Sequence, residues 1–145
     1  MKQRDSIKMT SEEAHAFLAS RHACALATNG KDGYPHVVAM WYTLEEGAIV
    51  MTSYAKAQKV VNLRRDPRAT VLVESGDKYK ELRGVMIGGR VELAEGPDAL
   101  REVVKLTGAD PRSDAAVCRA RKRVVIRFHP QRWASWDHSK IVGDY

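Results

Sequence analysis

Short runs in which apolar and polar residues alternate occupy most of this 145-residue chain, a pattern typical of β-strands that bury one face. Several runs are separated by turn signals such as Asn29-Gly30 and Glu45-Glu46-Gly47. The pattern predicts six strands, at residues 23–28, 35–44, 48–53, 69–74, 79–93 and from 124 to His129-Pro130.

Three segments have helical spacing instead. One follows Thr10-Ser11-Glu12-Glu13, which has the spacing of a capping box, and another has a proline at its first position and a glycine just past its end. The sequence therefore predicts helices after Thr10, over residues 56–65 and over residues 97–106.

Short turns join most of the predicted strands, and strands and helices do not alternate regularly. A closed or split antiparallel barrel therefore fits the pattern better than a parallel sheet. The length suits one domain, so we expect residues 1–145 to form a single mainly β unit with helices.

The net charge of +6 favours anionic partners: a phosphorylated cofactor, a polyanionic substrate, nucleic acid or an acidic membrane. The chain contains no apolar run near the ~20 residues that span a bilayer, and its first residues lead into no apolar signal segment. Cys24 and Cys118 have no CxxC spacing and are expected to be reduced. We therefore expect a cytoplasmic protein that does not bind a membrane.

The stretch from Thr52 to Lys59 is the strongest candidate for chemistry. A strand ends in the hydroxyl residues Thr52 and Ser53, a helix follows, and Lys56 and Lys59 lie on one face of it. Hydroxyl donors, lysines and the positive end of a helix together suit a phosphate. Spacing alone leaves a second interpretation open, a capped surface helix with solvated lysines.

Other constellations are weaker. The five histidines have no metal-ligand spacing, so no metal is expected. Ser135, Asp137 and His138 are the residue types of a hydrolase triad, but they are crowded into one segment without a nucleophile elbow. The basic run from Arg119 to Arg123 would suit nucleic acid, a solvated strand entry or an acidic cofactor tail. No recognition motif accompanies it, and we expect no nucleic-acid partner.

In order and spacing, several segments resemble the pyridoxamine 5′-phosphate oxidase-like family of FMN-binding split barrels. They are DGYPHVV at 32–38, Thr52-Ser53 with Lys59, NLRRDPRA at 62–69 and GGRVEL at 88–93. The tail WASWDHSK at 133–140 is similar to that of members that use the deazaflavin F420. The resemblance covers residues 12–140 and implies a six-stranded antiparallel split β-barrel.

The resemblance also implies a homodimer with cofactor sites between the subunits. Lys59 matches the phosphate-binding lysine, and Thr52 and Ser53 match the turn beside it. Many deazaflavin-using relatives have arginine where this chain has Gln58, a lost contact for which Lys56 would substitute. The cofactor ring would lie along the strand residues His36, Val37, Val38, Met40 and Trp41. Trp136 and Lys140 belong to a C-terminal tail, 131–145, that is expected to reach the dimer interface.

These features predict an oxidoreductase that transfers a hydride from reduced F420 to a small conjugated or heteroaromatic acceptor. The alternatives are an FMN-dependent enzyme and a non-catalytic flavin or haem carrier, for which His138 would be a candidate iron ligand. Three side chains are candidate proton donors, although water would also serve: His36, Tyr42 and Tyr79. For the tail aromatics Trp133, Trp136 and Tyr145, a role at an interface or a planar ligand competes with simple capping of the barrel.

Overall fold

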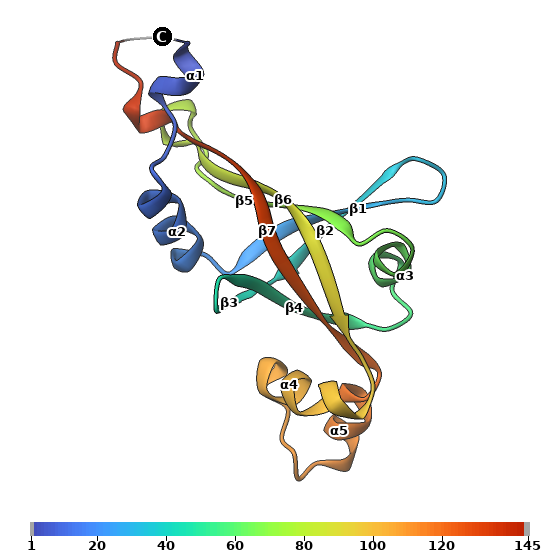
Figure 1. Cartoon of the computed structure of the whole chain (residues 1–145). Helices are drawn as coiled ribbons and strands as arrows, with labels where there is room; N and C mark the ends of the chain where they lie inside the picture. Colours follow the sequence, from blue (N-terminus) through green and yellow to red (C-terminus); the bar gives the residue numbers. More distant parts are fainter. Residues whose placement is uncertain (1, 144–145) are drawn as a thin grey trace.

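The protein is an antiparallel β-sheet curled into a half-barrel, with helices packed around it (Figure 1). The computed structural model describes residues 2–143. Seven strands hydrogen-bond in the order β2-β1-β5-β6-β7-β4-β3. Their bounds are Ala23–Asn29 (β1), Pro35–Trp41 (β2), Thr43–Glu45 (β3), Ala48–Tyr54 (β4), Arg68–Ser75 (β5), Arg83–Ala94 (β6) and Arg123–Asp137 (β7). The predicted split barrel is confirmed, with one more strand than expected.

The extra strand arises because the predicted strand at 35–44 is divided at Tyr42. β2 and β3 lie on either side of this residue in the sequence but at opposite edges of the sheet. The Tyr42 side chain is buried, and its hydroxyl donates to the Leu18 carbonyl at 2.6 Å. The chain therefore crosses from one edge of the sheet to the other at Tyr42. This residue type is not a turn signal, so the alternation of apolar and polar residues did not predict the crossing.

The three predicted helices are present, and the structure adds others. The longer helices are Ser11–Ser20 (α2), Gln58–Arg65 (α3), Pro97–Thr107 (α4) and Asp114–Ala120 (α5). A four-residue helix, Gln3–Ser6 (α1), precedes them, and single 3₁₀ turns occur at Tyr79–Glu81 (η1) and His138–Lys140 (η2). The predicted capping box forms: the Thr10 hydroxyl accepts from the Glu13 N–H, and the Glu13 carboxylate accepts from the Thr10 N–H. Among the described residues, no helix is long and apolar enough to cross a membrane.

Two apolar clusters hold the fold together. In the larger one, α2 and α3 pack on the inner face of the sheet around Phe128, which is fully buried. In the smaller one, Val103 of α4 and Ala120 of α5 pack against Val50 and Val125 on the other face of β4 and β7. β4 is therefore covered on both faces along most of its length, and its open edge lies near Thr52 and Ser53.

β7 is longer than predicted, because it continues past His129-Pro130 to Asp137. The pairing between β6 and β7 shifts register between Gly88 and Gly89: Gly88 pairs with Arg132, while Gly89 pairs with Pro130. Such a β-bulge accommodates a proline, which cannot donate a ladder hydrogen bond. Residues 131–137 of the predicted tail are thus strand, and Tyr145 lies outside the described residues.

Candidate functional site

Lys59 and Ser53 meet where β4 passes into α3. The turn 55–57 separates the two elements, and the Lys59 ammonium donates to the Ser53 hydroxyl at 3.2 Å. Ser53 is buried, whereas the lysine reaches it from the first turn of α3. The helix has no side-chain cap, since its N-cap residue is Ala57. The helix therefore lacks the side-chain cap that the alternative interpretation assumed, and Lys59 is half-buried, whereas Lys56 is solvent-exposed.

A second cation approaches the same strand from the other face. Arg123, the first residue of β7, pairs with Tyr54, and its guanidinium lies 4.5 Å from the Tyr54 ring centroid. Its Nε donates to the Thr52 hydroxyl at 3.3 Å. Since Thr52 and Ser53 are consecutive on β4, their side chains point to opposite faces, and each hydroxyl is held by one cation.

The two cations are not neutralised by the protein. Within residues 2–143, neither Lys59 nor Arg123 forms an ion pair with a carboxylate. Burial lowers the pKa of Lys59 below its ordinary value, and the positive charge of Arg123 lowers it further. An anion placed at this corner would relieve both costs, so the arrangement fits the phosphate of a cofactor.

Sequence reasoning did not select Arg123 for this site. It treated the residue as part of the basic run that begins at Arg119. The pairing of β4 with β7 brings Arg123 to Thr52, although the two residues are 71 positions apart in the sequence. That pairing is not visible in the local pattern.

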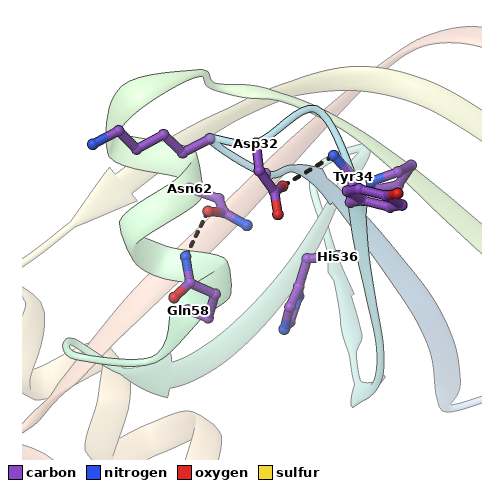
Figure 2. Close-up of a pocket in the computed structure, with 8 residues that line it drawn as sticks. Asp32, Tyr34, His36, Gln58 and Asn62 are labelled. Atoms are coloured by element: carbon purple, nitrogen blue, oxygen red, sulfur yellow. Dashed lines mark hydrogen bonds between the residues drawn. The ribbon is translucent and has the colours of Figure 1, made fainter.

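A cleft of about 610 Å³ adjoins this corner, between the β1–β2 turn and α3. Figure 2 shows His36 from β2 with Gln58 and Asn62 from α3 among its lining residues. The Gln58 amide donates to Asn62 Oδ1 at 2.8 Å, and the buried Asn62 amide donates to the Thr28 hydroxyl at 3.1 Å. Asn62 therefore fixes the Gln58 side chain at the cleft.

His36 supplies the cleft's unsatisfied polar group. Its Nδ1 is buried and has no hydrogen-bond partner among the described residues. Leaving such an atom unpaired costs roughly 1–3 kcal/mol, a cost that a ligand with a complementary group would remove. The cations at the Lys59 corner and the unpaired His36 nitrogen in the adjoining cleft therefore fit a cofactor that carries a phosphate and a further polar group.

The side chains of β2, the strand predicted to hold the cofactor ring, point to two opposite faces of the sheet. His36, Val38 and Met40 are half-buried toward the inside of the barrel, whereas Val37 and Trp41 are exposed on the opposite side. Trp41 stacks on the His22 ring with 4.5 Å between centroids. A hollow of about 220 Å³ has both Trp41 and Thr52 in its lining, so the structure brings these two predicted residues together.

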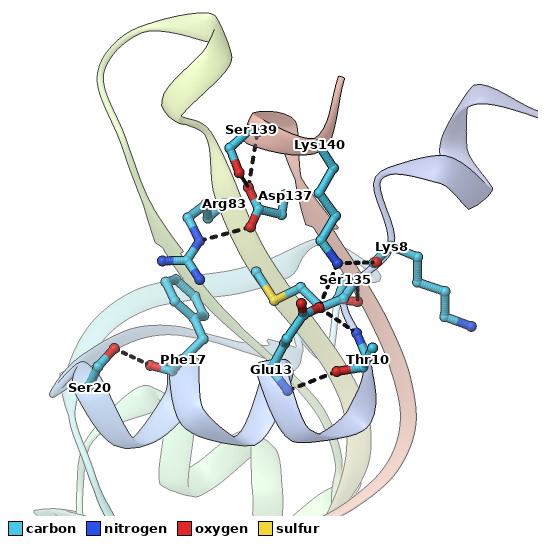
Figure 3. Close-up of polar contacts among 11 residues, drawn as sticks. Lys8, Thr10, Glu13, Phe17, Ser20, Arg83, Ser135, Asp137, Ser139 and Lys140 are labelled. Atoms are coloured by element: carbon cyan, nitrogen blue, oxygen red, sulfur yellow. Dashed lines mark hydrogen bonds and ion pairs between the residues drawn. The ribbon is translucent and has the colours of Figure 1, made fainter. Parts of the chain in front are cut away.

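Three other predicted residues lie apart from Lys59 within the chain. Lys56 is exposed, and among residues 2–143 its side chain forms no hydrogen bond or ion pair. Trp136 lies across β6, so close to Gly84 that a Cβ there would meet the indole ring at 2.2 Å. The Lys140 ammonium donates to the Glu13 carboxylate at 2.6 Å and to the Lys8 carbonyl at 3.1 Å (Figure 3). This network is at the opposite end of the sheet from α3 (Figure 1), so a role for Lys140 in the partner's site stays a prediction.

Of the three candidate proton donors, His36 is the one that lies in the cleft. Burial raises the pKa of Tyr42 to about 12, and its hydroxyl is committed to Leu18. Tyr79 packs edge-on against His138, with 4.6 Å between ring centroids, near the C-terminal end.

The residue types of a hydrolase triad are not assembled into one. The Ser135 hydroxyl accepts from the Met9 N–H at 3.1 Å. Asp137 binds Ser139 and pairs with Arg83, while the His138 ring contacts the Tyr79 carbonyl. These three side chains therefore tie the N- and C-terminal segments to the sheet.

Comparisons with known proteins agree with this fold. The family model described as pyridoxamine 5′-phosphate oxidase matches residues 10–137. The F420H2-dependent biliverdin reductase of Mycobacterium tuberculosis is 34% identical over 95 residues, which cover 63% of this chain and 65% of that relative. The matched segment thus spans about two thirds of the relative's length.

Two solved structures extend the comparison to nearly the whole chain. The crystal structure of a conserved hypothetical protein from Mycobacterium tuberculosis superposes with a TM-score of 0.79 at 41% identity, covering 99% of this chain and 98% of that one. A structure described as an F420 reductase has a TM-score of 0.68 and 26% identity, covering 86% of this chain and 98% of its own. With a family model that spans all seven strands, the chain belongs to the pyridoxamine 5′-phosphate oxidase family.

Proposed function

We propose that this protein is an F420-dependent oxidoreductase that reduces a small conjugated or heteroaromatic acceptor. The observation that carries the proposal is the pair of cations at the end of β4, Lys59 and Arg123, held by adjacent hydroxyls and matched by no carboxylate within residues 2–143. The similarity to the F420H2-dependent reductase and the F420 reductase structure supports the choice of coenzyme.

Different residues would bind the coenzyme's anionic groups and orient its ring. Lys59 and Ser53 would hold the phosphate, and Arg123 with Thr52 would hold an anionic group on the other side of β4. His36 would give its unsatisfied Nδ1 a partner on the bound ring, which orients the ring in the cleft. When bound, reduced deazaflavin supplies the hydride, and the protein contributes orientation and exclusion of water.

The distribution of charge favours F420 over FMN. FMN carries one phosphate, for which Lys59 would suffice, whereas F420 adds a carboxylate-rich tail. Beside Arg123 lies a hollow of about 370 Å³ between β4 and the α4–α5 region, lined also by Arg119 and by Asp110, whose carboxylate pairs with Arg112. Because Asp110 is already paired with Arg112, Arg119 and Arg123 would be the partners of a carboxylate-rich tail there. An FMN-dependent enzyme is the alternative, because Gln58 replaces the arginine expected beside Lys59 in deazaflavin users.

Cofactor titration tests the proposal directly. Purified protein would be titrated separately with F420 and FMN while coenzyme fluorescence is followed, and its visible spectrum would be recorded as isolated. We expect saturable quenching of F420 at one site per chain and oxidation of F420H2 in the presence of an acceptor. Tighter binding of FMN would support the alternative, and a Soret band would support a haem carrier. Binding of none of them would refute a cofactor role.

The outer face of the sheet supports a homodimer. Directly paired residues of an antiparallel sheet point to the same side. Val37 pairs with Ala27, Ala27 pairs with Thr70, and Thr70 pairs with Gly88, so these four positions lie on one side of the sheet. The same side therefore carries exposed or half-buried apolar residues from four strands: Val37, Ala39, Trp41, Leu72, Met86 and Trp136. Val37 is 62% exposed and Trp41 74% exposed, which is unusual for large apolar side chains on a sheet. We assign this surface to the contact with a second copy.

Val37→Glu should therefore dissociate the proposed dimer. A charge buried at an apolar interface without a partner is expected to weaken association at least 100-fold, or about 3 kcal/mol. Sedimentation velocity across a concentration series would measure the change. Val61→Glu is the matched control, since Val61 is exposed on α3 and lies outside the paired outer face. Equal dimerisation of wild type and Val37→Glu would place the interface elsewhere.

A further inference from the structure

The hydrogen bonds behind Gln58 decide which end of its amide is free at the candidate cofactor site. Gln58 is the first residue of α3 and immediately precedes Lys59, the candidate phosphate-binding residue. Its side chain lines the cleft, and its Nε2 donates to Asn62 Oδ1, one turn further along the helix, at 2.8 Å (Figure 2). A glutamine amide can turn either its oxygen or its nitrogen toward a ligand, so the role of Gln58 depends on what fixes that choice.

The orientation of the Asn62 amide is fixed by its other two partners. Asn62 is fully buried, and its Nδ2 donates to the hydroxyl of Thr28, also buried, at 3.1 Å. Arg65 Nη2 approaches Asn62 Oδ1 at 3.5 Å. A guanidinium can only donate, so the Asn62 atom that faces it must be the oxygen and not the nitrogen. The reversed orientation of Asn62 would set two donors against each other.

The orientation of Gln58 follows from that of Asn62. Because Asn62 Oδ1 can only accept, Gln58 must turn its nitrogen toward it, which leaves Gln58 Oε1 as the free end of the amide. Within residues 2–143, Gln58 Oε1 has no hydrogen-bond partner. A carbonyl oxygen accepts a hydrogen bond from a hydroxyl but repels an oxyanion. Gln58 therefore differs in kind from its neighbour Lys59, whose ammonium attracts an oxyanion.

We propose that Gln58 is a specificity-determining residue whose Oε1 accepts a hydrogen bond from a hydroxyl of the chain that links the coenzyme's ring to its phosphate. Asn62 is the positioning residue that holds this acceptor in place. The inference rests on the proposed function, in which Lys59 holds the phosphate and His36 meets the ring. Gln58 adjoins Lys59 in the sequence and lines the same cleft as His36, so the linking chain would pass it. FMN and F420 both carry a ribityl chain with hydroxyls at this place, so Gln58 selects for the chain and not between the two coenzymes.

Fluorescence titration with matched probes tests the role of Gln58. F420 and FMN are each paired with an analogue in which an unsubstituted alkyl chain of the same length replaces the ribityl chain. We expect Gln58→Met, which keeps the side-chain length but removes the amide, to weaken binding of the ribityl coenzyme about fivefold. The affinity for its alkyl analogue should not change. Equal affinity of Gln58→Met and wild type for the ribityl coenzyme, or equal losses with both members of a pair, would overturn the proposal.

Lys59→Ala separates this inference from the proposed function. It should weaken binding of both members of a pair alike, because both carry the phosphate. Failure of wild type to bind either coenzyme would refute the cofactor site itself, and the role of Gln58 with it. Saturable binding by wild type together with an unaltered preference for the ribityl chain in Gln58→Met would refute the role of Gln58 alone.

Thr28→Val tests the positioning role of Asn62. The substitution removes the hydroxyl that holds the Asn62 amide, so the preference for the ribityl coenzyme over its alkyl analogue should fall. Thr28→Ser retains a hydroxyl and should retain the preference. A purely structural role would lower the melting temperature of Thr28→Val without changing the preference between the two probes. An unchanged preference in Thr28→Val would therefore overturn the assignment of Asn62 as a positioning residue.

Discussion

Replacing Lys59 with alanine is expected to raise the dissociation constant of F420 about 30-fold, equivalent to roughly 2 kcal/mol, without unfolding the protein. The ammonium donates to Ser53 and has no carboxylate partner among the described residues, so its removal breaks no ion pair. The loss therefore falls on the bound phosphate. Fluorescence titration gives the affinity, and thermal unfolding verifies that the fold persists.

Arg101→Ala is the charge-matched control for this variant. It removes the same unit of positive charge from an exposed position on α4 and should change affinity less than threefold. If Lys59→Ala binds as wild type does, the phosphate is held elsewhere and the assignment of this corner fails. A loss of similar size in both variants would indicate long-range attraction rather than a specific contact.

The same lysine predicts a pH dependence. Burial and the charge of Arg123 lower the pKa of Lys59 in the free protein below its ordinary value of 10.5. A bound phosphate favours the protonated form, so affinity is full below the free-protein pKa and falls as pH rises through it. In wild type this decline should begin below pH 10.5, and in Lys59→Ala it should be absent. Affinities measured from pH 7 upward would show the difference.

The largest effect on stability is expected from Gly89→Ala. A Cβ at this buried position would meet the His129 carbonyl oxygen at 2.3 Å and the Phe128 ring at 2.7 Å. Neither contact is with a flexible side-chain end, so β6 and β7 must separate at the bulge. We expect a loss of about 3 kcal/mol of unfolding free energy and a melting temperature lower by roughly 10 °C.

Gly88→Ala is a matched control one residue away. Its Cβ would meet Arg132 atoms no closer than 3.6 Å, which is ordinary contact, so we expect a change within about 1 kcal/mol. Denaturant unfolding of the two variants side by side makes the comparison. Similar stability of both would mean that the strands do not approach as closely as the structure shows.

The order and type of most elements could be predicted from the sequence because their signals are local. Alternation located the strands, and the proline and glycine that flank α4 fixed both of its ends, with Gly108 in the left-handed region at a φ of +66°. The division of residues 35–44 at Tyr42 could not be predicted, since it depends on packing against Leu18 across the barrel. The continuation of β7 past Pro130 likewise depends on a bulge that forms only against β6.

Some residues of the candidate site could likewise be predicted from local sequence, and others could not. Lys59, Thr52 and Ser53 lie within eight residues, and their types together with the family resemblance predicted a phosphate site there. Arg123 and the unsatisfied His36 nitrogen enter only when β7 pairs with β4 and β2 faces α3. Lys140 was predicted from the family resemblance of the tail; within the chain it pairs with Glu13, and its role in a partner's site stays a prediction.

The sequence by itself determined the strand-rich class and proposed the candidate phosphate corner from residues close together in the chain, and the order and spacing of its motifs indicated the family. Only the tertiary structure decided which charges remain without partners. Arg123 reaches the Lys59 corner only through the pairing of β4 with β7, and neither residue has a carboxylate partner among residues 2–143. Whether a charge is compensated depends on every element packed around it, and local sequence carries no record of that.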